Sequence, residues 1–176
     1  MNRVAESGII TLNLEHYFPT EDLVAFDLKD FLFQGLILKE KDYRQALKSH
    51  EWSAYEGKVV CIFCSTDAII PVWAFMLAAS HASLSARDTY IGTKAAYIDQ
   101  HYRVFIQGMD SDPYQDARVV IKGCSDKPVP ASAYAYLTKK LKPVAKSIMY
   151  GEPCSCLLYT SPSPRDQRGS RMPSSA

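Results

Sequence analysis

The sequence lacks an excess of either charge, and this argues against a nucleic-acid-binding surface. Its 20 lysines and arginines are nearly balanced by 19 aspartates and glutamates, which gives a formal charge of +1. Domains that bind nucleic acid usually carry lysine and arginine clustered on one face, and no basic patch stands out in this sequence. We therefore expect no nucleic-acid partner.

The sequence also lacks long apolar runs and the glycine-rich motifs of nucleotide sites. Its first twelve residues, MNRVAESGIITL, contain no apolar segment typical of a signal peptide. The longest nearly apolar run, residues 68–79, is too short to span a bilayer and suits a buried helix. Neither a phosphate-cradling glycine motif nor a GxSxG elbow is present. We expect a cytoplasmic protein with no membrane partner.

The last residues, 156–176, have the composition of a disordered tail and no apolar period. Their sequence, CLLYTSPSPRDQRGSRMPSSA, can be back-translated into a common transposase-type sequencing adapter. We interpret this tail as translated adapter and expect the natural C-terminus beyond Ser155 to be missing. Without the tail's three arginines and one aspartate, 17 basic and 18 acidic residues remain, a formal charge of −1.

The pattern of the remaining 155 residues predicts a single α/β domain. Apolar runs rich in β-branched residues alternate with helical segments, as in a three-layer, mainly parallel sheet with helices on both faces. An antiparallel pairing of the first two strands at one edge is compatible with this pattern. The expected strands are residues 8–14, 23–28, 58–65, 88–91, 118–124 and 144–150, and the expected helices are residues 39–49, 68–82, 93–108 and 131–141.

The placement of the cysteines carries most of the functional information. Three cysteines, Cys64, Cys124 and Cys154, each follow or end an expected strand, where α/β sheets bind ligands. If those strands are parallel neighbours, the three thiols converge on one rim and can hold zinc, iron or an iron–sulfur cluster. The alternative is that they are core residues, as we expect for Cys61, which points to the opposite face of its strand from Cys64.

Two aspartates follow these cysteines closely. Asp67 lies three residues after Cys64, and Asp126 lies two residues after Cys124. Either carboxylate can complete a metal site or act as a base. The simpler interpretation is that Asp67 caps the following helix and that Asp126 is a turn residue.

Four stretches resemble a known family. They are DFLFQGLILKEKDYR, CSTDAIIPVWAFML, RVVIKGCSDKPVP and KSIMYGEPCS. The chain resembles the uncharacterised bacterial family "domain of unknown function 2480" over residues 1–155. The resemblance implies a small cytoplasmic protein with no established activity. It also implies an association with iron–sulfur cluster assembly genes, and therefore iron–sulfur assembly proteins as partners.

Three hypotheses follow. The first is a metal-binding accessory protein with ligands Cys64, Cys124 and Cys154, completed by Asp67, Asp126 or an exogenous group. The second is a thiol-dependent enzyme that uses Cys124 as nucleophile, with Asp126 and Lys127 beside it in the sequence. The third is a non-catalytic interaction module with core cysteines. The sulfur positions discriminate among them.

Overall fold

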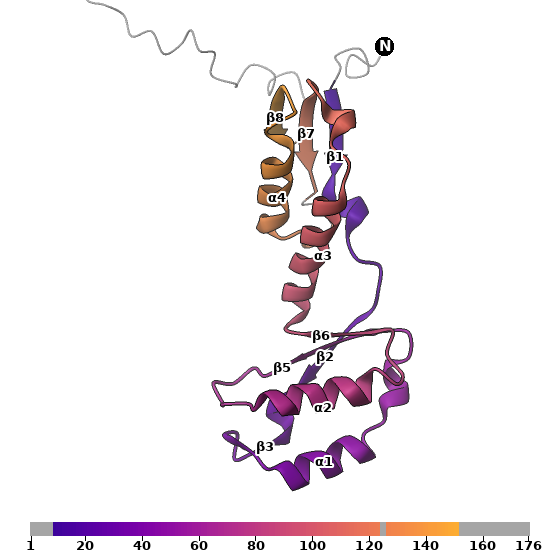
Figure 1. The fold of residues 1–176 in the computed structure, drawn as a ribbon, viewed down its shortest axis with the longest axis vertical. Coiled ribbons are helices and arrows are strands. Elements are labelled where there is room, and N and C mark those ends of the chain that lie inside the picture. Colours follow the sequence, from indigo (N-terminus) through magenta and orange to yellow (C-terminus); the bar gives the residue numbers. More distant parts are fainter. Residues whose placement is uncertain (1–8, 124–125, 152–176) are drawn as a thin grey trace, which may run out of the picture. The chain divides into compact units, whose positions relative to one another are not determined.

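The chain divides into two compact units, each with its own parallel sheet. The structure is a computed structural model that describes residues 9–123 and 126–151. Unit 1 combines Met1–Tyr17 with Ile106–Ala176, and unit 2 is Phe18–Phe105. Figure 1 labels the elements of both units.

Unit 2 is built around a three-stranded parallel sheet with the order β2-β5-β6. A short antiparallel hairpin, β3–β4, follows the first strand. The elements of unit 2 are β2 (Leu23–Asp27), the 3-10 helix η2 (Leu28–Phe31), β3 (Leu32–Phe33), β4 (Ile37–Leu38), α1 (Glu40–Ser49), η3 (Trp52–Tyr55), β5 (Val59–Phe63), α2 (Val72–Ala82), β6 (Asp88–Ile91) and most of α3 (Lys94–Gly108).

The central strand β5 is buried on both faces, as its unbroken apolar sequence predicts. Val60 and Ile62 pack into a core with residues of α1 and α2. Cys61 points to the other face and is fully buried, which confirms that it is a core residue. Burial raises the pKa of its thiol, and the charge of Lys94 on α3 opposes this rise. Helices α1 and α2 pack against the Val60 and Ile62 face of this sheet.

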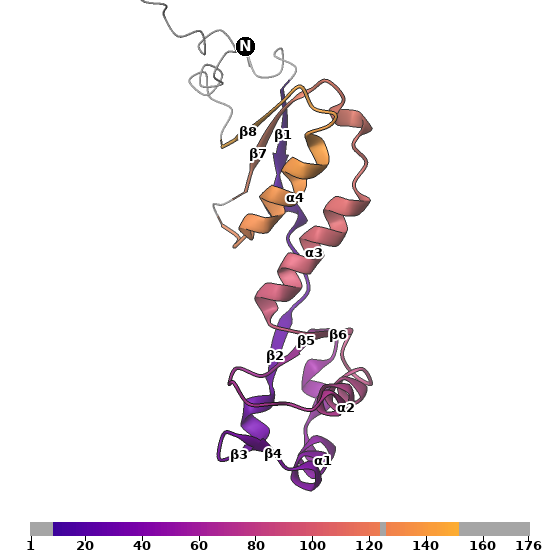
Figure 2. The same cartoon turned by 60° about the vertical axis from the view of Figure 1, so that its left-hand side comes forward.

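Unit 1 has a second three-stranded parallel sheet, with the order β1-β7-β8. Figures 1 and 2 show α4 running alongside this sheet. The elements of unit 1 are β1 (Ile9–Asn13), η1 (Leu14–Tyr17), the end of α3, η4 (Asp112–Tyr114), β7 (Arg118–Lys122), α4 (Ala131–Leu141) and β8 (Ser147–Tyr150).

The two units contain the same strand–helix–strand segment, displaced by 59 residues without a gap. Strand β5 begins at 59 and β7 at 118, helix α2 at 72 and α4 at 131, and strand β6 at 88 and β8 at 147. Pro71 and Pro130 occupy the two helix N-caps. Gly92 and Gly151 follow the two last strands with positive φ, and their N–H groups donate to Ile62 and Ile121 at 2.8 and 3.0 Å. The chain therefore builds one substructure twice.

The structure confirms an α/β fold with mainly parallel sheets and corrects two details. The strands form two three-stranded sheets, and the first two strands each pair in parallel, β1 with β7 and β2 with β5. Antiparallel pairing at the N-terminus is therefore wrong, because each of these strands joins a distant central strand. The single domain over residues 1–155 stays a prediction.

The predicted cap at Asp67 is also wrong. Helix α2 begins at Val72 with Pro71 as its N-cap, and Asp67 lies in the preceding loop as an exposed residue. The residue before a proline is disfavoured in helical conformation, so a helix begun at Ala68 would have to pass through a strained Ile70.

Within residues 9–123 and 126–151, we find no helix long and apolar enough to cross a membrane.

Candidate functional site

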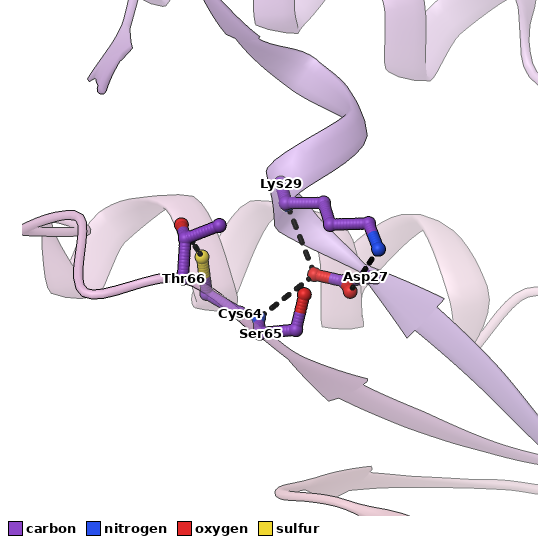
Figure 3. Close-up of polar contacts among 5 residues, drawn as sticks. All are labelled: Asp27, Lys29, Cys64, Ser65 and Thr66. Carbon is purple, nitrogen blue, oxygen red and sulfur yellow. Dashed lines mark hydrogen bonds and ion pairs between the residues drawn. The ribbon is translucent and has the colours of Figure 1, made fainter. Parts of the chain in front are cut away.

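The carboxyl end of the unit 2 sheet is organised by an aspartate, Asp27. It is the last residue of β2, and its Oδ1 accepts the backbone N–H groups of Lys29 and Ser65, each at 3.0 Å. Its Oδ2 lies 3.6 Å from the Lys29 Nζ. Figure 3 shows this carboxylate joining the start of η2 to the loop that follows β5. Asp27 therefore fixes the position of the residues beside Cys64.

Opposing effects act on the Asp27 carboxyl group. Burial raises its pKa, whereas the Ser65 side chain, the two backbone N–H donors and the Lys29 charge lower it. The net result is a pKa below the ordinary value of 3.8. Asp27 is thus an ionised anchor at neutral pH, because hydrogen bonds to the charged form outweigh its desolvation.

We expect Asp27→Ala to lower the free energy of unfolding by about 1–2 kcal/mol, because two backbone donors lose their acceptor. Asp27→Asn keeps an acceptor and removes only the charge. Since the folded-state pKa is lowered, the charge stabilises the fold above pH 3.8 and progressively less as the pH falls through the folded-state value. Urea unfolding at pH 7 and pH 3 measures both effects. The exposed Asp30→Asn is the control, and a wild-type advantage over Asp27→Asn that grows on acidification would contradict the assignment.

Cys64 is one of the residues that line a pocket of about 380 Å³ at the end of β5. Its Sγ is 3.2 Å from the Thr66 hydroxyl oxygen, as Figure 3 shows. The pocket lining comes from β5, the loop before α2, α2 and the end of β6; it consists of Ile62, Phe63, Cys64, Thr66, Ala68, Ile70, Phe75, Ile91 and Gly92. The half-buried thiol thus has a hydroxyl partner at an open pocket whose surface is partly polar and partly apolar.

The two other predicted thiol ligands follow the strands of unit 1. Cys124 and Cys154 lie outside the described residues, one residue after Gly123 and three residues after Gly151. Strands β7 and β8 are parallel neighbours, with Ile121 opposite Tyr150. The condition that the cysteine-bearing strands be neighbours therefore holds for Cys124 and Cys154. Cys64 follows β5, which pairs with β2 and β6 in the other sheet.

Asp126 is held at the same end of the unit 1 sheet by a buried carboxylate that sequence reasoning missed. The backbone N–H of Asp126 donates to Glu15 Oε1 at 2.9 Å, and Glu15 is only 9% exposed. Asn13 Oδ1 in turn accepts the Glu15 N–H at 3.1 Å. The sequence did contain a signal for this turn, which Asn13 and Asp27 share. Each ends a strand, and its side-chain oxygen accepts a hydrogen bond from the backbone N–H of the residue two positions later.

The described residues on their own do not assemble a metal centre. Among residues 9–123 and 126–151, no group of three histidine, cysteine, aspartate or glutamate side chains could hold a metal ion. Cys64 and Asp67 are therefore not joined there by a third described ligand. Asp126 is exposed, so its carboxylate faces solvent at the end of β7 where the chain leads into Cys124.

The comparison with known protein families gives a match. A family described as "Protein of unknown function (DUF2480)" matches residues 1–160. This confirms the resemblance read from the sequence, and the match extends five residues beyond Ser155. No curated protein and no solved structure matches the chain.

Proposed function

We propose that this chain, which belongs to the DUF2480 family of proteins of unknown function, is a metal-binding accessory protein. The site we propose lies at the carboxyl edge of the β1-β7-β8 sheet. Its thiolate ligands are Cys124 and Cys154, and Asp126 is its oxygen ligand. Zinc, iron or an iron–sulfur cluster suits such thiolates.

The parallel pairing of β7 with β8 is the observation that carries this proposal. The two strands end side by side, with the N–H of Gly151 donating to the Ile121 carbonyl at 3.0 Å. Adjacent strands are about 4.8 Å apart, and two sulfurs on one metal lie within roughly 4 Å of each other. Cys124 directly follows Gly123, and two residues lie between Gly151 and Cys154, so the tethers are long enough for the two thiols to meet.

The sequence hypothesis also included Cys64 and Asp67 as ligands. These residues follow the central strand of the other sheet, at the end that Asp27 organises. A site with only Cys124 and Cys154 as thiol ligands (the two-thiol site) would keep its metal in a Cys64 variant. A site that also includes Cys64 (the three-thiol site) would lose it. We propose the two-thiol site.

Elemental analysis of the full chain, expressed and purified without oxygen, tests the site. We expect near-stoichiometric zinc or iron that is lost in Cys124→Ser and in Cys154→Ser but kept in Cys64→Ser. Cys156→Ser is a necessary control, because this tail cysteine lies two residues from Cys154. Loss of metal in all three variants would replace the two-thiol site by the three-thiol site, and a metal-free parent would overturn the proposal.

The same samples separate the proposal from a thiol-dependent enzyme. A metal-free parent in which iodoacetamide alkylates Cys124 much faster than Cys64 would favour a nucleophile activated by Asp126 and Lys127. Slow alkylation of all cysteines in that parent would favour an interaction module with core thiols.

A cytoplasmic location and iron–sulfur assembly partners complete the proposal. The reducing cytoplasm keeps thiolates available for metals, and the family resemblance supplies the association with cluster assembly. Co-purification from cells with tagged iron–sulfur scaffold proteins, compared between wild type and Cys124→Ser, tests the partner class.

A further inference from the structure

Strand β8 forms one edge of the unit 1 sheet and borders an apolar groove. It pairs with β7 and, among the described strands, with no other. The groove has a volume of about 360 Å³ and runs between β8 and α4. It is lined by Ile121, Tyr134, Thr138, Lys142, Ile148, Met149 and Tyr150.

At the carboxyl end of the sheet, one wall of the groove is held in place by contacts of Tyr134. The Tyr134 hydroxyl donates to the Gly123 carbonyl at 2.6 Å, and its ring meets Tyr150 edge-on with centroids 5.6 Å apart. Ile121 lies opposite Tyr150 in the parallel register, so their side chains share one face of the sheet with Ile148. An incoming strand beside β8 would direct alternate side chains onto this apolar wall.

The other end of the groove is basic. Lys142 lines it at the end of α4, while Lys139 on the same helix and Lys146 just before β8 are exposed. The acidic residue bonded nearby is Asp116, whose backbone N–H donates to the Val144 carbonyl at 2.9 Å. Lys142 in the groove lining and Lys146 one residue before β8 place positive charge at this end. Lysines beside an edge strand disfavour pairing with a second copy of the same edge.

We propose that the β8 edge binds an extended acidic peptide segment of a partner protein, which adds to the sheet as a fourth strand. The edge of a sheet supplies main-chain hydrogen bonds for such strand addition, and the pockets beside it select alternate side chains. The apolar wall at Ile148 and Tyr150 takes the partner's apolar side chains. Lys142 and its neighbours take its carboxylates and orient the strand.

Fluorescence anisotropy with a labelled peptide that alternates glutamate with valine tests the site on the full chain. We expect saturable binding that weakens as salt is raised, because exposed charge pairs are screened. Lys142→Glu is expected to weaken binding about tenfold and to reverse the preference in favour of a peptide that alternates lysine with valine. Lys48→Glu, an exposed position on α1 in unit 2, is the matched control and should change nothing.

A second peptide isolates the strand-addition mode. N-methylation of alternate backbone amides removes the main-chain donors while keeping the side chains, so it should abolish binding. The proposal is overturned if the glutamate–valine peptide does not bind, if the N-methylated peptide binds equally well, or if Lys48→Glu has the same effect as Lys142→Glu. Cys124→Ser should leave peptide binding intact, so this test and the metal test fail independently.

Discussion

Replacing Leu47 by alanine is expected to lower the free energy of unfolding of unit 2 by about 3 kcal/mol. Leu47 is fully buried on α1, in the core that joins α1, α2 and the sheet. Truncating a buried leucine loses its transfer free energy and leaves a cavity, which together cost about 2–5 kcal/mol. Helix α2 contributes the small residues Ala74 and Ala78 to this core. Their methyl groups are too short to fill the cavity that the Leu47 side chain would leave.

Tryptophan fluorescence during urea unfolding measures this effect. Both tryptophans of the chain, Trp52 and Trp73, lie in unit 2, and the Trp52 indole donates to the Leu47 carbonyl at 2.8 Å. Leu36→Ala is the matched control, since this leucine is 68% exposed in the same unit and its truncation should cost less than about 0.5 kcal/mol. Equal effects of the two substitutions would show that α1 does not pack as described.

Replacing Gly123 by alanine is expected to destabilise unit 1 by about 2–4 kcal/mol. Gly123 directly follows β7 and has a φ of +138°, a backbone conformation that residues with a side chain rarely adopt. A Cβ there would lie 3.1 Å from the backbone nitrogens of Leu14 and Glu15 and from the Leu14 Cβ. Backbone atoms cannot swing aside as the end of a flexible side chain can, so the turn after β1 or the end of β7 must move.

Hydrogen exchange read by mass spectrometry locates this effect. We expect the amides of β1 and β7 to exchange at least about thirtyfold faster in Gly123→Ala, since each 1.4 kcal/mol is a factor of ten. Gly108→Ala is the control, because Gly108 ends α3 with no atom within 4 Å of an added Cβ. Unchanged protection of β1 and β7 would contradict the close approach of Gly123 to η1.

Much of the local structure was predictable, because helices and strands depend on short-range patterns. The run VVCIF predicted a strand buried on both faces, and the fourth helix has the predicted bounds of residues 131–141. The start of α2 was misjudged because Asp67 offered a cap that Pro71 overrode. Such an error shifts the start of a helix by only a few residues, because the rival signals are close together in the sequence.

The candidate site was only partly predictable, because its contacts join residues far apart in the chain. Cys64, Cys124 and Cys154 were recognised as residues that follow strands, but no sequence pattern states which strand lies beside which. Asp27 and Glu15 were overlooked because each accepts a backbone N–H from a distant loop, at Ser65 and Asp126 respectively. Hydrogen bonds between residues so far apart in the chain produce no repeating pattern in the sequence from which they could be predicted.

By itself the sequence determined an α/β protein of this family, with its helices and strands nearly in place and its thiols at strand ends. Only the tertiary structure decided that β1 joins β7 and β8 while β2 joins β5 and β6. This pairing assigns the strand before Cys64 to a different sheet from the strands before Cys124 and Cys154. The bounds of the elements also show that one strand–helix–strand unit occurs twice at a spacing of 59 residues. The physical reason is that propensity and burial act along the chain, whereas sheet order depends on which distant backbones pair.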